Sequence, residues 1–318
     1  MSQALLEIKN LVKHFKTPEG TVRAVDGIDF SVQKGEWFSV VGESGSGKST
    51  VAYLVAGIYM PTSGEILFNG NELPGDVRKR PKSLKREIQM VFQDPGGSIN
   101  PKKNVREVIT LPLQVHRITG RGDYTERVRD LLEMVGLPAE CMERYPMTLG
   151  GGERQLVAVA RALATNPSFI LLDEPTSALD VSMQATVIRH LMELQGKLGL
   201  TYLFITHNLS VVRNVSSRVA IMYLGKVQEI APTSEFFKNP VHPYTQMLLA
   251  SIPVITDEEE ALKPRKVTST GEIPSPTNPP PGCSFGPRCP FKEDRCSRDM
   301  PELMEVAPGH LVRCHQQH

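Results

Sequence analysis

The residue types that most directly suggest chemistry form a glycine-rich segment ending in lysine and serine. Residues 42–49 read Gly-Glu-Ser-Gly-Ser-Gly-Lys-Ser and match G-x-x-x-x-G-K-[ST] at every fixed position. The glycines let the backbone curl so that successive N–H groups face a phosphate. Lys48 is then expected to reach the β- and γ-phosphates, and Ser49 to bind Mg²⁺. The run predicted to bind nucleotide is Gly42, Glu43, Ser44, Gly45, Ser46, Gly47, Lys48, Ser49 and Thr50.

Two carboxylates follow an apolar run and form a second candidate site. Residues 169–172 read Phe-Ile-Leu-Leu, a pattern typical of a buried parallel strand, and Asp173 and Glu174 come next. Ligands of α/β sheets bind at the ends of such strands. We expect Asp173 to hold Mg²⁺, directly or through water, and Glu174 to orient or deprotonate the attacking water. The alternatives are a plain polar turn here and a glycine-rich turn without a ligand at 42–49.

The elements that must position these residues alternate along the chain. Residues 4–41 read as strands, 49–57 as a helix and 88–92 as a strand. Residues 104–163 have a helical texture, with Val128, Leu131, Leu132 and Val135 at i, i+3, i+4 and i+7. Residues 183–198 then read as a helix and 202–205 as a strand. This alternation predicts an α/β fold with a mostly parallel sheet.

The composition changes near Pro232. Seven prolines lie between Pro274 and Pro290, which excludes a long helix or a central strand there. We therefore expect a first domain at 1–231 and a loop-rich, cysteine-containing C-terminal extension at 232–318.

Residues 4–230 resemble an ATPase of the ABC transporter family. The resemblance implies an ABC-type P-loop ATPase with an antiparallel β subdomain and a helical subdomain at about 95–165. Phe15 matches the aromatic residue that stacks on adenine, and Gln93 matches the glutamine that senses Mg²⁺ and the nucleophilic water. Ser177–Asp180 matches the loop that crosses to a partner ATPase, and His207 the switch histidine that contacts the γ-phosphate.

The segment matching the family signature departs from its usual Leu-Ser-Gly-Gly-Gln. Here the segment reads Leu149, Gly150, Gly151, Gly152 and Glu153. In this family two ATPases sandwich ATP head to tail, so each signature completes the site on the other subunit. Gly150 removes a hydroxyl donor to the γ-phosphate, which is worth about 1.5–3 kcal/mol, and Glu153 replaces a neutral amide. The sequence thus predicts an asymmetric heterodimer with one weak site; the alternative is that both sites turn over.

The segment from Asn239 to Leu249, which includes His-Pro-Tyr at 242–244, looks like the tail of ATPases that serve oligopeptide and dipeptide importers. The same group serves importers of nickel chelates and oligosaccharides, and the 199–226 region looks like the second of two paired ATPases. The resemblance implies four partners: a homologous ATPase, two transmembrane permease subunits and, indirectly, a substrate-binding protein. It implies a place on the cytoplasmic face of the membrane.

Four of the five cysteines lie after residue 282: Cys283, Cys289, Cys296 and Cys314. Their spacing, C-x5-C-x6-C-x17-C, lacks the close pairs of zinc sites, whereas spacings in iron–sulfur sites vary more. The resemblance also points to a [4Fe–4S] cluster; zinc and unliganded thiols remain alternatives. His310 and His315 are spare ligand candidates whose simplest interpretation is a surface histidine. Cys141 is most simply a small apolar filler.

Composition excludes several functions. Lys plus Arg is 36 and Asp plus Glu is 35, giving a net charge of +1 and no basic excess for nucleic acid. No apolar run has the length of about 18 residues that spans a bilayer, and the N-terminus lacks the pattern of a signal peptide. ATP and Mg²⁺ are the expected cofactors. Besides the importer ATPase, two alternatives remain open: an ABC ATPase not coupled to transport, and a nucleotide switch outside this family.

Overall fold

The computed structural model describes residues 4–118, 124–252 and 271–316. The chain forms two compact units, each described here by itself. Unit 1 comprises Met1–Gln33, Trp37–Gly75 and Ile205–His318, and unit 2 comprises Lys34–Glu36 and Asp76–Phe204. Residues 119–123 of the predicted helical stretch and residues 253–270 of the predicted C-terminal extension lie outside the described residues.

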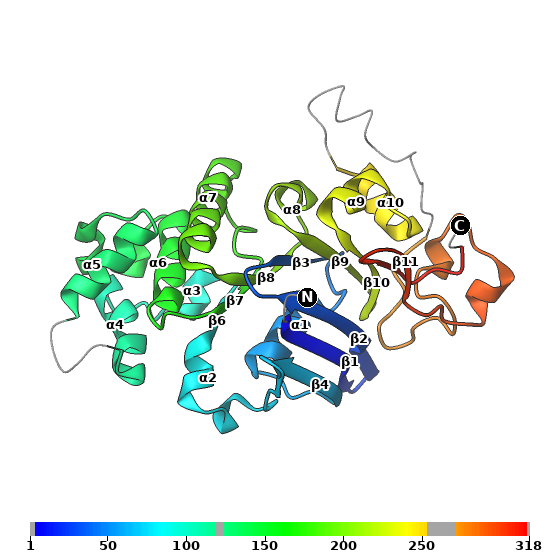
Figure 1. Cartoon of the computed structure of the whole chain (residues 1–318), viewed down its shortest axis with the longest axis horizontal. Helices are drawn as coiled ribbons and strands as arrows, with labels where there is room; N and C mark the ends of the chain where they lie inside the picture. Colours follow the sequence, from blue (N-terminus) through cyan, green and yellow to red (C-terminus); the bar gives the residue numbers. More distant parts are fainter. Residues whose placement is uncertain (1–3, 119–123, 253–270, 317–318) are drawn as a thin grey trace. The chain divides into compact units, whose positions relative to one another are not determined.

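Unit 1 contains an antiparallel sheet of four strands in the order β2-β1-β4-β5 (Figure 1). The strands are β1 (Ala4–Thr17), β2 (Gly20–Gln33), β4 (Ser63–Phe68) and β5 (Asn71–Glu72). Leu6 pairs with Val32 and Ile8 with Phe30, and all four side chains are buried. Alternating apolar residues thus give the sheet one buried face, as the period of a strand requires.

Unit 1 also carries strands in the order β11-β12-β10-β9-β3. They are β3 (Trp37–Val41), β9 (Arg218–Tyr223), β10 (Lys226–Pro232), β11 (Met304–Ala307) and β12 (His310–Val312). β3 and β9 are parallel and β9 and β10 antiparallel, so this part of the sheet is mixed. β12 pairs antiparallel with β10, with Glu229 opposite Val312. The C-terminal segment therefore extends the sheet that carries the phosphate loop.

The helices of unit 1 flank these strands (Figure 1). They are α1 (Lys48–Ala56), α8 (Leu209–Val215), α9 (Thr233–Lys238) and α10 (Pro243–Ala250), with 3₁₀ turns η4 (Gly286–Arg288) and η5 (Asp294–Ser297). Pro243 opens α10, where its fixed φ suits a first helical turn. The proline-rich stretch from 274 to 290 contains only the short η4, as its composition requires.

Unit 2 holds strands in the order β8-β7-β6, with β6 parallel to β7. The strands are β6 (Ile88–Val91), β7 (Phe169–Asp173) and β8 (Thr201–Thr206), the last of which ends in unit 1. The buried run predicted at 169–172 is confirmed as β7. Every residue of β7 and β8 is buried, which explains why these strands do not alternate.

Most of unit 2 is helical. Its helices are α2 (Lys82–Glu87), α3 (Pro95–Ser98), α4 (Val105–His116), α5 (Thr125–Met134), α6 (Gly151–Leu163) and α7 (Val181–Leu198), with 3₁₀ turns η1 (Val77–Lys79), η2 (Ala139–Glu143) and η3 (Pro146–Thr148). A capping box between Asn104 and Glu107 starts α4. Val128, Leu131, Leu132 and Val135 are fully buried, so the predicted helical period marks a real core face.

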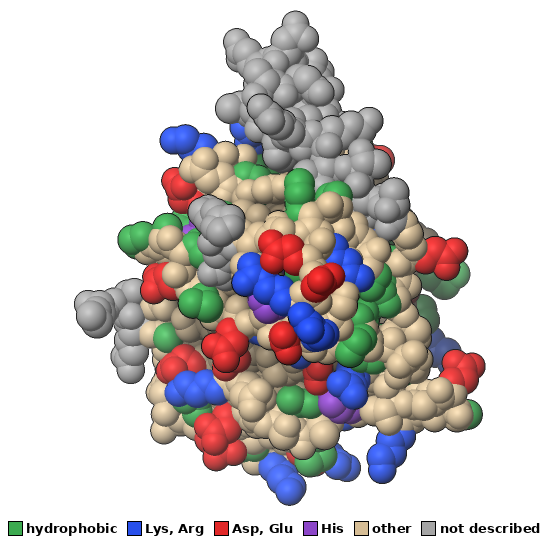
Figure 2. Space-filling view, turned by 90° about the vertical axis from the view of Figure 1, so that its right-hand side faces the viewer, with side chains coloured by type: hydrophobic (Ala, Val, Ile, Leu, Met, Phe, Trp, Pro, Cys, Tyr) green, Lys and Arg blue, Asp and Glu red, His purple; other side chains and the backbone are tan. Residues whose placement is uncertain are grey.

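The C-terminal residues belong to unit 1 rather than to a compact unit of their own. The boundary at 231/232 and the helical subdomain at about 95–165 stay predictions. In the part of the chain that the structure describes, the helices are all too short or too polar to cross a membrane. On the face drawn in Figure 2, acidic and basic side chains are interspersed.

Candidate functional site

The phosphate loop joins the buried strand β3 to α1 in unit 1. Lys48 is 5% exposed. Its Nζ donates to the carbonyl oxygens of Gly42 (2.8 Å) and Glu43 (2.9 Å) and to the Ser46 hydroxyl (3.4 Å). The ammonium group therefore lies over the loop, held by loop oxygens, where it can exchange them for phosphate oxygens.

Two glycines of the loop admit no side chain. Gly47 has φ +101°, and a Cβ there would lie 2.0 Å from the carbonyl oxygen of Ala24. A Cβ on Gly42 would lie 2.1 Å from the carbonyl oxygen of Met222. These contacts are with backbone, so they cannot relax by moving a side chain. The two glycines therefore let the loop pack tightly between β2 and β9.

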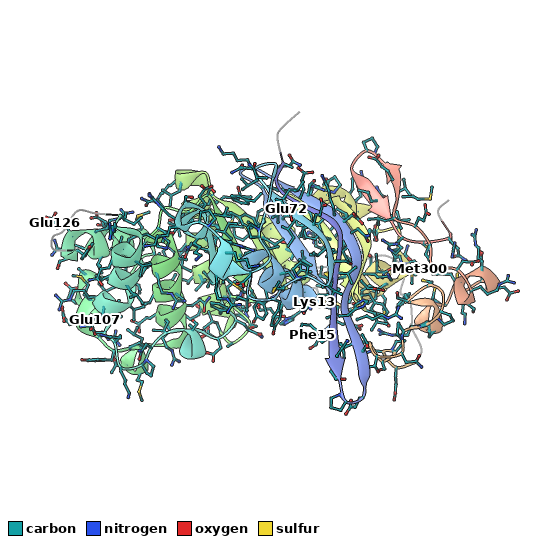
Figure 3. The ribbon with its side chains drawn as sticks, turned by 90° about the horizontal axis from the view of Figure 1, so that it is seen from below. Lys13, Phe15, Glu72, Glu107, Glu126 and Met300 are labelled. Carbon is teal, nitrogen blue, oxygen red and sulfur yellow. The ribbon has the colours of Figure 1, made fainter. Side chains whose placement is uncertain are left out.

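Phe15 and His207 also belong to unit 1. Phe15 lies on β1, where its ring meets Tyr59 edge to face at 5.2 Å and 77°. The Lys13 ammonium is 4.8 Å from the centroid of Phe15, and Figure 3 shows both residues on the β1–β2 hairpin. His207 follows β8 and is exposed. The exposed His207 ring is accessible to a nucleotide. The roles assigned to Phe15 and His207 stay predictions.

The acidic pair lies at the end of β7 in unit 2. Asp173 is fully buried as the last residue of the strand. Glu174 has φ +43°, a left-handed conformation that is uncommon for residues other than glycine. Gln93 Nε2 donates to Glu174 Oε2 at 3.1 Å and lies 3.5 Å from the Ser177 hydroxyl. The structure thus brings together the predicted water-activating and water-sensing residues, and such backbone strain is frequent at functional sites.

The signature segment forms the N-terminus of α6 in unit 2. Gly150 is the N-cap, and its N–H donates to Glu153 Oε2 at 2.7 Å. Arg144 pairs with the same carboxylate at 3.1 Å. The Glu153 carboxylate, which stands where the family has a neutral amide, is therefore turned back onto its own helix and balanced by the Arg144 cation.

The signature packs closely on the segment predicted to reach a partner. A Cβ on Gly151 would meet Leu179 at 3.1 Å, and one on Gly152 would meet Met183 Cε at 2.0 Å. Asp180 caps α7 by accepting from Met183 N at 3.0 Å. A helix cap is a sufficient local reason for Asp180, and its contact with a partner stays a prediction.

The four C-terminal cysteines line one cavity of unit 1. Its lining residues are His242, Pro243, Cys283, Phe285, Gly286, Cys289, Phe291, Cys296, Cys314, His315 and Gln316. None of the four forms a disulfide. Across residues 4–118, 124–252 and 271–316, no three His, Cys, Asp or Glu side chains are grouped to hold a metal ion. Cys141 is buried in unit 2 and is not among the residues that line this cavity.

Burial raises the pKa of three of these thiols. It raises the pKa of Cys289 to about 11 and also raises the pKa of Cys283 and of Cys314. Each thiolate near the others would further raise its neighbours' pKa by repulsion. The thiols of Cys283, Cys289 and Cys314 are therefore protonated at neutral pH unless a cation compensates the charge of their thiolates.

The interpretation of His310 as a surface histidine is wrong. His310 is 3% exposed, and its Nε2 lies 2.7 Å from Oε1 of the fully buried Glu229 on β10. The same carboxylate accepts from the N–H groups of Val241 and His242, both at 3.0 Å. A buried carboxylate requires partners, and pairing β12 with β10 brings His310 to it. His315 lines the cysteine cavity.

Two contacts with the phosphate loop are not predicted by the sequence analysis. Arg288 forms an ion pair with Glu43 of the phosphate loop at 2.8 Å, and the Tyr244 hydroxyl accepts from Glu43 N at 3.0 Å. Arg288 lies 245 positions from Glu43. No local pattern marks such a pair.

The loop between β3 and α1, together with the acidic strand end of β7, defines the class of P-loop nucleotide-binding proteins. Two family models match the chain: ABC transporter over residues 25–177, and oligopeptide/dipeptide transporter, C-terminal region, over residues 228–296.

Full-length relatives narrow the class. The chain is 46% identical over 321 residues to the oligopeptide transport ATP-binding protein AppF of Bacillus subtilis, covering 98% of this chain and 97% of that protein. It is 44% identical over 322 residues to the probable peptide ABC transporter ATP-binding protein y4tS of Sinorhizobium fredii, covering 99% and 90%.

Solved structures agree. The dimeric ATP-binding cassette MJ0796 bound to ADP and Pi matches with a TM-score of 0.65 and 30% identity, covering 72% of this chain and 98% of that one. The cassette MJ1267 in its ADP conformation matches with a TM-score of 0.63 and 27% identity, covering 75% and 96%. At least a quarter of this chain thus has no counterpart in these cassettes. The chain belongs to the ATP-binding protein family of ABC transporters, and it is an ATPase.

Proposed function

We propose that this protein is the ATP-hydrolysing subunit of an ABC importer of peptides, on the cytoplasmic face of the membrane. The main support is that two family models match the same chain, one for the ABC transporter ATPase and one for the oligopeptide/dipeptide transporter C-terminal region. Its relatives over the full length are named for peptide transport. Its partners are then a homologous ATPase, two transmembrane permease subunits and, indirectly, a substrate-binding protein.

Each of the predicted site residues has its own proposed role in ATP binding or hydrolysis. The loop residues from Gly42 to Thr50 bind the phosphates, with Lys48 on the β- and γ-phosphates, and Phe15 stacks on adenine. Ser49, Gln93 and Asp173 would hold Mg²⁺, and the buried carboxylate of Asp173 at its strand end is a ligand suited to that ion. Glu174, oriented by Gln93, polarises the attacking water, and His207 contacts the γ-phosphate.

The test is ATP turnover of the chain alone and then assembled with the paired ATPase, the permease subunits and a peptide-loaded substrate-binding protein. The ATPase of an importer should hydrolyse ATP faster in the assembly with an empty substrate-binding protein than as the chain alone. It should hydrolyse ATP faster still when the substrate-binding protein is loaded with peptide. Equal turnover in all three states would contradict coupling to import. Stimulation by an oligosaccharide or nickel chelate but not by peptide would contradict the cargo.

We also propose that the ATPase works as an asymmetric heterodimer. Gly150 has no hydroxyl to offer the partner's γ-phosphate, and its N–H is occupied by Glu153. The site formed by this signature and the partner's loop should therefore be the weaker one. The site on this chain's own Lys48, Glu174 and His207 should carry most turnover.

Gly150→Ser restores a hydroxyl at this position. We expect ATP binding at the weak site to tighten by about ten- to a hundredfold, because a hydrogen bond to a charged group is worth about 1.5–3 kcal/mol. The measurement is equilibrium ATP binding and turnover of the assembled heterodimer. Gly196→Ser is the matched control, since a Cβ there meets nothing within 4 Å. If Gly150→Ser changes neither the ATP affinity nor the turnover, the asymmetric model is wrong.

For the C-terminal cysteines we propose a [4Fe–4S] cluster with a structural role. The support is that all four thiols line one cavity walled partly by Phe285 and Phe291. Four cysteines of one chain are the usual ligand set of such a cluster, and each binds a different iron, so their sulfurs need not converge on one point. A cluster would supply the cation charge that holds these buried thiols as thiolates.

Protein purified without oxygen should contain about four irons and four sulfides per chain. Cys289→Ser should lose most of this iron, and Cys141→Ser, which changes a buried cysteine outside the cavity, should retain it. The readouts are elemental analysis and visible absorption that bleaches on reduction. The cluster would be refuted by a content of one zinc per chain. It would also be refuted if the protein held no metal and the four C-terminal thiols were free to titrate.

A further inference from the structure

The C-terminal extension contacts Glu43 of the phosphate loop. The Arg288 guanidinium donates to both carboxylate oxygens of Glu43, at 2.8 Å and 3.2 Å. Such a two-pronged pair fixes both the position and the orientation of the carboxylate. All of these residues lie in unit 1.

Arg288 is itself held in place. Its side chain is 10% exposed, and its guanidinium carbon lies 5.7 Å from the ring centroids of both Tyr223 and Phe285. Its Nη1 also lies 3.4 Å from the Tyr223 hydroxyl. Packing against two aromatic rings lowers the entropy cost of the ion pair, in contrast to an exposed pair between mobile side chains.

The backbone of Glu43 is fixed from the same side. Its N–H donates to the hydroxyl of Tyr244, a fully buried residue of α10. Its carbonyl oxygen accepts from Lys48 Nζ at 2.9 Å. The side chain, the N–H and the carbonyl of one loop residue are therefore all engaged, two of them by the extension.

The fixed backbone of Glu43 and the ion pair on its carboxylate should both affect phosphate binding. The loop binds phosphate through oriented N–H groups, so restricting its backbone lowers the entropy lost on binding. The Glu43 carboxylate would also repel a polyphosphate unless a cation balances it, and a guanidinium at 2.8 Å provides that balance.

We propose that Arg288, with Tyr244, is a positioning residue for the phosphate loop, so that the C-terminal extension completes the ATP site of its own chain. Arg288 acts through Glu43 and does not touch the nucleotide. This inference rests on the proposed assignment of residues 42–50 as the nucleotide site. The extension then has a role in nucleotide affinity as well as in the fold.

The test is equilibrium binding of a fluorescent ATP analogue to the full-length chain. Arg288→Met should weaken binding about tenfold, and Arg288→Lys, which keeps the charge and loses the fork, about threefold. Arg288→Met combined with Glu43→Gln should recover affinity to within about threefold of the unmodified chain, because the uncompensated carboxylate is gone. In the assembled transporter, KM for ATP should rise with kcat unchanged within about twofold.

Arg313→Met is the matched control. Arg313 also bonds the extension to β10, through the carbonyl of Val227 at 2.9 Å, but it does not contact the loop. It should leave nucleotide affinity unchanged. The proposal is overturned if Arg288→Met binds like the unmodified chain, if it and Arg313→Met weaken binding equally, or if Glu43→Gln gives no recovery. Should Arg288→Met fail to fold, Arg288→Lys with and without Glu43→Gln decides by the same criteria.

Lys48→Ala separates this inference from the function on which it rests. It should abolish binding of the analogue. If Lys48→Ala binds normally, the loop is not the nucleotide site and the proposed site assignment fails. If Lys48→Ala abolishes binding and Arg288→Met has no effect, only the positioning role fails.

Discussion

Glu174→Gln is expected to lower ATP turnover of the assembled transporter by about 10²–10⁴-fold, the usual contribution of a general base. Glutamine has nearly the same shape and can still accept the hydrogen bond from Gln93, which joins Glu174 at 3.1 Å. It cannot take a proton or carry the charge that polarises water. Because the carboxylate is not a phosphate ligand, nucleotide affinity should stay within about twofold. Phosphate release and equilibrium ATP binding measure the two effects separately.

Glu193→Gln is the matched control for this change. Glu193 is an exposed carboxylate of unit 2 on α7, with a loose contact of 3.8 Å to Lys197. Its loss should leave turnover unchanged, since exposed pairs of this kind contribute at most about 1 kcal/mol to stability. If Glu174→Gln keeps more than half of the turnover, another group activates the water. If it loses nucleotide binding as well, the strand end rather than the base has been damaged.

Glu229→Ala is expected to destabilise the protein by about 3–5 kcal/mol, because several buried donors lose their acceptor at about 1–3 kcal/mol each. The carboxylate is fully buried. It accepts from two backbone N–H groups at 3.0 Å and contacts His310 at 2.7 Å. Its removal leaves those donors without an acceptor in a site closed to water. Urea unfolding followed by circular dichroism should show a lower midpoint.

Glu305→Ala controls for removing a carboxylate from the extension. Glu305 lies on β11, is exposed, and accepts from Gly309 N at 2.8 Å. A surface change of this kind should cost no more than about 0.5 kcal/mol. Equal midpoints for Glu229→Ala and Glu305→Ala would show that the buried network does not fasten the extension to β10.

Much of the candidate site can be predicted from short stretches of sequence. Residues 42–49 specify a phosphate loop because each glycine acts on its own backbone, and the strand and helix that flank it are short-range patterns. The period of Val128, Leu131 and Leu132 specifies a helix face for the same reason, since side chains at 3.6-residue spacing share one side. The acidic pair follows its strand in the chain, so its place at the strand end was predictable.

Only the tertiary structure decided the contacts between distant positions. Glu43 and Arg288 are brought together because β12 and η4 fold back beside the sheet that carries the loop, and neither residue type is unusual in its own neighbourhood. His310 is buried because its strand pairs beside Glu229, although its immediate sequence resembles a surface turn. Local patterns fix backbone geometry over a few residues, whereas pairing of distant charges depends on how the chain closes its sheet, and sequence spacing carries no measure of that closure.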